Sequence, residues 1–164
     1  MSKQFWIFLV AGLAVATGLL ALLLVGTKSA HLELNGEILK VRVLNLGPQA
    51  SLVVADFRVT NPSGLPFVVS GVEITLEPTA GESAKAMTVS KPQVDAVFQG
   101  ARLIGTKYND VLSLQDRVAP HQTVDRMVAG RFELPEAAID RRKSLRLKIE
   151  DVDGTAAEIT ERKK

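Results

Sequence analysis

An uncharged run from Phe5 to Gly26 limits what the N-terminal part of this chain can become. The run contains no Asp, Glu, Lys, Arg or His. As a helix of roughly 22 residues it would extend about 33 Å, enough to cross a bilayer core of about 30 Å. A core helix of that length would have to bury every face. The run therefore favours a transmembrane helix over a buried core helix.

The residues after the run separate a retained anchor from a cleaved signal peptide. A signal peptide has an apolar core of about 7–15 residues and ends at a small-x-small site. Here the run is longer, and the residues Val25-Gly26-Thr27 at its end are followed by Lys28. We favour an uncleaved signal anchor at residues 1–27, a juxtamembrane linker at 28–36 and a folded domain at 37–164. Cleavage after the run is the alternative.

Charges on the two sides of the run set the expected orientation. The α-amino group and Lys3 precede it, whereas Lys28, Glu33 and Glu37 follow it. Because positive charge favours the cytoplasmic side, the short N-terminus is expected inside. This predicts a single-pass membrane protein whose domain is extracytoplasmic, in the periplasm or at the cell surface.

Composition excludes several function classes for the domain. The formal net charge of +2 is too small to indicate a nucleic-acid partner. The absence of cysteine excludes disulfides, thiol catalysis and cysteine-based zinc sites. About 137 residues after the anchor match the size of one ordinary domain.

Alternation with a period of two dominates the domain and indicates strands. Apolar side chains alternate with polar ones over the segments 39–43, 53–60, 67–77 and 145–150. Asp153-Gly154 predicts a hairpin turn before a last strand at 156–159. Seven or eight short strands without βαβ units favour an all-β fold, an antiparallel β-sandwich of immunoglobulin or fibronectin III character. A small barrel is the alternative.

One segment interrupts the β pattern. Ser90 and Gln93 have the spacing of a capping box, and Pro92 is tolerated in the first turn of a helix. Gly100 is a natural stop signal. We therefore expect a short helical inset at 91–99 within the sandwich.

The segment 61–66, Asn-Pro-Ser-Gly-Leu-Pro, is dense in turn residues. It lies between the strands expected at 53–60 and 67–77, and we expect those two strands to pair as a hairpin across it. Residues 55–63 with 65–76 resemble the late-embryogenesis-abundant type 2 domain, also called the water-stress and hypersensitive-response domain. They also resemble single-span bacterial proteins with an exported immunoglobulin-like domain. The resemblance implies a binding or protective role and supplies no catalytic residues.

The titratable residues show no catalytic or metal-binding pattern. His31 and His121 are the two histidines, and neither lies in a cluster with metal-ligand spacing. Asp151-Val152-Asp153-Gly154 lacks the later ligands of a calcium loop, so a hairpin turn is favoured there. We expect no enzyme activity, no metal and no cofactor.

Lys107, Tyr108 and Asn109 are the candidate contact residues for a protein partner whose identity the sequence does not give. Tyr108 is the single tyrosine and follows a glycine-containing loop. For Tyr108 itself, a buried side chain over the end of the sandwich is the favoured interpretation and a partner contact is the alternative. The leading hypothesis is a membrane-anchored, extracytoplasmic, non-catalytic binding or scaffolding module. A stress-protective domain at the membrane surface, as the resemblance suggests, is the second.

Overall fold

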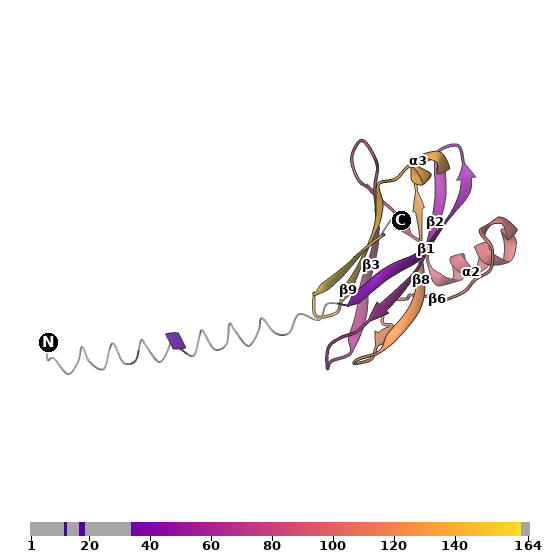
Figure 1. Cartoon of the computed structure of the whole chain (residues 1–164). Coiled ribbons are helices and arrows are strands. Elements are labelled where there is room, and N and C mark those ends of the chain that lie inside the picture. Colours follow the sequence, from indigo (N-terminus) through magenta and orange to yellow (C-terminus); the bar gives the residue numbers. More distant parts are fainter. Residues whose placement is uncertain (1–11, 13–16, 19–33, 162–164) are drawn as a thin grey trace. The chain divides into compact units, whose positions relative to one another are not determined.

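The computed structural model describes residues 12, 17–18 and 34–161 of the chain (Figure 1). Most of the predicted anchor therefore lies outside the described residues. Among the residues that are described, no helix combines the length and the apolar character needed to cross a bilayer. The chain divides into two units, Met1–His31 and Leu32–Lys164, and the sheets belong to the second.

The second unit contains two five-stranded sheets, named sheet I and sheet II here. Sheet I has the order β1-β2-β8-β5, and β6 pairs with β8 in parallel. Its strands are β1 (Asn35–Gly47), β2 (Ala50–Thr60), β5 (Met87–Thr88), β6 (Asp110–Val111) and β8 (Thr123–Phe132). Sheet II has the order β10-β9-β3-β4, and β7 pairs with β3. Its strands are β3 (Phe67–Glu77), β4 (Ala84–Lys85), β7 (Arg117–Val118), β9 (Ser144–Asp151) and β10 (Ala156–Thr160).

The main core lies between the two sheets and follows the predicted alternation. Inward-facing side chains of β2 and β9, including Phe57 and Leu147, are completely buried in it. Burying alternate side chains on one face of each sheet is how a β-sandwich forms its core. The all-β prediction and the antiparallel β-sandwich are confirmed, with the parallel β6–β8 pair as a local exception.

The predicted hairpin between β2 and β3 is wrong. β2 pairs with β1 on one edge and with β8 on the other, so neither edge is left for β3. β3 instead pairs with β9 in sheet II. The buried Asn61 holds the crossing, since its Nδ2 donates to the carbonyl oxygens of Leu65 at 2.8 Å and Val118 at 3.0 Å. The turn chemistry therefore serves a connection from one sheet to the other.

The helical inset is confirmed as α2 (Lys91–Gly100), and the short helices η1 (Arg102–Ile104) and α3 (Glu136–Asp140) accompany it. The Gln93 side chain accepts a hydrogen bond from the Ser90 backbone N–H at 3.1 Å, one half of the predicted capping box. β1 already begins at Asn35, within the segment expected to be a linker. In Figure 1, α2 lies on the side of β1 and β8 that faces away from β3 and β9.

Candidate binding site

A second apolar layer covers the outer face of sheet I. Leu52, Val54 and Met127 of the sheet pack there against Val94 of α2 and Ile104 of η1. Val94 is the one buried residue of α2. The side chains of β2 are thus buried on both faces, which is uncommon for an antiparallel strand because such sheets usually leave one face solvated.

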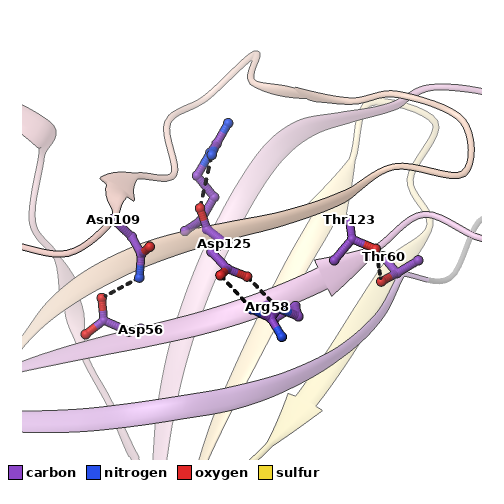
Figure 2. A network of polar contacts seen from close by, with 7 residues as sticks. Asp56, Arg58, Thr60, Asn109, Thr123 and Asp125 are labelled. Carbon is purple, nitrogen blue, oxygen red and sulfur yellow. Dashed lines mark hydrogen bonds and ion pairs between the residues drawn. The ribbon is translucent and has the colours of Figure 1, made fainter.

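A buried ion pair lies at the edge of this layer. The Arg42 guanidinium of β1 lies 2.6 Å from the Asp56 carboxylate of β2, and their side chains are only 9% and 4% exposed. Arg42 Nη1 also donates to the carbonyl oxygens of Ile104 at 3.2 Å and Thr106 at 2.8 Å. Asn109 Nδ2 donates to Asp56 Oδ1 at 3.0 Å, as Figure 2 shows. The pair therefore fixes the loop after η1 onto sheet I.

Two of the three predicted contact residues have partners within the domain. Lys107 forms an ion pair with Asp95 of α2 at 2.7 Å, and Asn109 binds Asp56. Tyr108 is 64% exposed, so the favoured interpretation of a buried side chain over the sandwich end is wrong. Lys40 Nζ lies 5.4 Å from the centre of the Tyr108 ring, within the range of a cation–π contact. A partner contact at these residues stays a prediction.

Three further hydrogen bonds in Figure 2 form a ladder between β2 and β8. Arg58 donates two hydrogen bonds to Asp125, at 2.7 and 2.8 Å, and the hydroxyls of Thr60 and Thr123 are 2.8 Å apart. The Arg58 hydrogen bonds lower the pKa of the Asp125 carboxyl below its ordinary value. Because the ladder is exposed and Arg58 and Asp125 neutralise each other, we interpret these contacts as cross-strand pairs that stabilise the sheet.

An apolar groove opens where the two sheets meet at β5 and β6. Its volume is about 660 Å³. The segments after β5 and β6 separate from β8 close to each other. Val89, which follows β5, donates its N–H to the Ala129 oxygen, and Leu112, which follows β6, donates its N–H to the Met127 oxygen. β3 faces them from sheet II. The apolar lining consists of Gly71, Val72, Val89, Pro92, Leu112 and Leu114.

The hydroxyl groups that line the groove are hydrogen-bonded within the protein. The Thr88 hydroxyl donates to the Val72 oxygen at 3.2 Å, and the Ser90 hydroxyl donates to Gln93 Oε1 at 2.8 Å. Ser113 Oγ donates to the Val111 oxygen at 3.4 Å. Lys91 is the one charged residue among the described residues that line the groove. The groove thus offers apolar contact along its walls and a single cation.

The sequence did not indicate this groove. The apolar residues Val111, Leu112 and Leu114 give no sign in the sequence that Leu114 is 66% exposed. The groove depends on two-residue strands, β5 and β6, which are too short to carry a periodic pattern.

The remaining candidates are structural or lie outside the described part. The predicted turn at Asp153-Gly154 is confirmed by the antiparallel pairing of β9 and β10. Asp151 Oδ1 accepts the Val68 N–H at 3.1 Å. His121 is exposed in a turn with φ of 59°, and His31 lies outside the described residues. Over residues 34–161, no three His, Cys, Asp or Glu side chains gather in a way that could hold a metal ion.

Comparison with known proteins gives similarity in architecture alone. Neither a family model nor a curated protein matches the chain, so the likeness to late-embryogenesis-abundant type 2 domains stays a prediction. A β-sandwich protein of uncharacterized role from Clostridium difficile 630 aligns at 11% identity over 79% of this chain and 86% of its own, with a TM-score of 0.40. The archaellum periplasmic stator protein FlaG from Sulfolobus acidocaldarius aligns at 15% identity, over 77% and 98%, with a TM-score of 0.34. The complex of FlaF and FlaG aligns at 14%, over 76% and 86%, with a TM-score of 0.32.

Proposed function

We propose that this chain is a non-catalytic binding module, held at a membrane by residues 1–27 and exposed on the extracytoplasmic side. The observation that carries the binding role is the groove between β3 and the ends of β5 and β6. Its volume of about 660 Å³ lies within the range of about 300–1,000 Å³ that is usual for small-ligand sites.

The chemistry of the groove supports binding in preference to catalysis. Catalysis by acid, base or nucleophile needs a reactive side chain within reach of a second group that activates it. The hydroxyls of Thr88, Ser90 and Ser113 donate to backbone carbonyl or amide oxygens, not to a histidine nitrogen or a carboxylate that could activate them. The walls are suited to holding a molecule without changing it.

The membrane location in this proposal rests on the sequence. The uncharged run Phe5–Gly26 is long enough to cross a bilayer, and Lys3 with the α-amino group favours an internal N-terminus. We also propose the immunoglobulin or fibronectin III class for the sandwich, which its two antiparallel sheets around one core support.

Photocrosslinking in membranes tests the binding role. Benzoylphenylalanine replaces Leu114 at the groove rim or Val152 in the β9–β10 turn, two apolar side chains of similar exposure, 66% and 59%. We expect an adduct of one defined mass at position 114 and none at 152. Adducts at neither position, or the same mixture at both, would contradict the binding role.

Protease accessibility tests the location separately. Protease added to intact spheroplasts should digest the domain at residues 34–161. A domain that is cut only after lysis would show that the proposed orientation is wrong, whatever the groove binds.

A further inference from the structure

We infer that the groove binds a single-chain anionic amphiphile, a fatty acid or a molecule of the same chemistry, with its chain along the walls and its carboxylate at Lys91. This inference rests on the proposed binding function and names the class of its ligand. Three properties of the groove lead to it: the apolar walls, the internally bonded hydroxyls and the single cation.

The walls suit an alkyl chain. Val72, Val89 and Leu112 come from three separate segments and line the groove together with Leu114. Methylene groups gain free energy when they leave water for such a surface, and they require no polar partner there. Leu114 is largely exposed without a ligand and would be covered by a chain that extends to the rim.

The same walls suit an extended peptide poorly. A bound strand must find partners for its own N–H and C=O groups, and an unpaired buried polar group is costly. Strand addition also needs an open sheet edge. β4 pairs with residues 75–76 of β3, and β7 pairs with residues 67–68 of the same strand, so the edge facing the groove is short. The wall hydroxyls already donate within the protein.

The charge of the groove selects the head group. Lys91 is its one charged lining residue and lies in the first turn of α2. Within the part of the chain that the structure describes, no hydrogen bond or ion pair is found for its ammonium group. Two carboxylates lie beside the lining: Glu150, next to Gly71, forms an ion pair with Lys148 at 2.8 Å, and Asp116 accepts the Ser113 N–H at 2.9 Å. An anionic head group therefore meets an unpaired cation, and a cationic head group meets repulsion.

A photoreactive fatty acid tests the inference on the full-length protein. The protein is reconstituted in phosphatidylcholine vesicles, labelled with a diazirine-bearing fatty acid, and mapped by mass spectrometry of its fragments. We expect labels on segments 88–92 and 112–114. Dodecanoate should compete for these labels, whereas dodecylamine, which has the same chain and the opposite charge, should not.

Matched variants tie the label to the groove. Leu114→Asp should abolish the label, and Lys91→Glu should weaken competition by dodecanoate about tenfold. Leu65→Asp and Lys143→Glu change an exposed leucine and an exposed lysine away from the groove, and both should behave as the unmodified protein does.

The outcomes separate the ligand class from the binding function. The inference would be overturned if Leu114→Asp left the labelling unchanged, or if dodecylamine competed as strongly as dodecanoate. If the fatty acid leaves the groove unlabelled while position 114 crosslinks to a protein, the ligand class is wrong and the binding module stands. If position 114 gives no adduct either, both are wrong.

Discussion

The outer faces of the two sheets differ in their exposure to solvent. On sheet I, α2 and η1 cover Leu52, Val54 and Met127, and the Arg42–Asp56 pair is buried beside them. On sheet II, the outer face is a solvated array of charges. Its ion pairs join Lys85 to Glu73, Lys148 to Glu150, and Arg146 to both Glu77 and Glu158.

This difference in exposure is visible in the sequences of the strands, because each strand's pattern indicates whether one or both of its faces are buried. β9 alternates strictly, with Leu145, Leu147 and Ile149 inside and charged residues outside, as expected when one face meets water. β2 is apolar on both faces over Leu52–Ala55 and has the buried Asp56 next to them. A run of apolar residues within an alternating strand therefore marks the face that another element covers.

The sharpest test of this comparison removes one partner of the buried pair. Asp56→Ala leaves the Arg42 guanidinium buried without its counter-charge, and we expect a loss of about 3–5 kcal/mol in the free energy of unfolding. Urea titration followed by circular dichroism measures it. Glu158→Ala on sheet II is the control and should leave the midpoint unchanged. If both variants lost the same free energy of unfolding, the charges on sheet I would be no more buried than those on sheet II.

A smaller effect is expected from the contact that attaches α2 to sheet I. Val94→Ala shortens the one buried side chain of α2, and we expect a cost of about 2 kcal/mol from lost apolar contact and the resulting cavity. Hydrogen exchange of the α2 amides should accelerate more than that of the β9 amides. Lys91→Ala, on the same helix but exposed, is the matched control. Uniform acceleration across both regions would mean that α2 does not unfold as a local unit.

Replacing both members of the buried pair should cost less than removing one. In Arg42→Met/Asp56→Leu no charge is left buried, so we expect unfolding free energy within about 1 kcal/mol of the unmodified protein. A double-mutant cycle with the two single variants measures the coupling. A double variant as unstable as Asp56→Ala would show that the bonds from Arg42 to the Ile104 and Thr106 oxygens matter more than the charge pairing.

The sequence predicted local structure well and long-range contacts poorly. The bounds of β3 and the start of α2 follow from alternation and from Ser90 with Gln93, which act over a few residues. The separation of β2 and β3 into different sheets depends on strands far along the chain, because β8 occupies the edge that a hairpin would need. Tyr108 was singled out as the single tyrosine, but its neighbour Lys40 comes from a distant strand.

The buried pair and the groove escaped prediction for the same reason. Arg42 and Asp56 occupy alternate positions of two strands and look like ordinary outward-facing charges. Only the packing of α2 and η1 over them makes the pair a buried one. The groove likewise arises from where β5 and β6 leave β8, a property of strand ends that carries no local sequence signal.

The smallest expected effect is the pH dependence of the solvated face. A hydrogen bond from Lys85 lowers the pKa of Glu73, and hydrogen bonds from Ser144 and Arg146 lower that of Glu77. The hydrogen bond to Glu150 raises the pKa of Lys148. The carboxylates therefore stabilise the fold fully above their unfolded pKa of about 4.3, and this stabilisation is lost as pH falls through the lower folded values.

Lys148 acts in the opposite direction at high pH. Its contribution is complete below the unfolded pKa of about 10.4 and is lost as pH rises through the higher folded value. The urea concentration at the unfolding midpoint should thus stay constant between about pH 6 and pH 9 and decline gently below and above that range. About 1 M salt should flatten both declines because these pairs are partly open to solvent, whereas it should leave the Asp56→Ala loss largely intact. If salt reduced that loss as strongly as it reduced the acid slope, the Arg42–Asp56 pair would be as accessible to ions as the charges of sheet II.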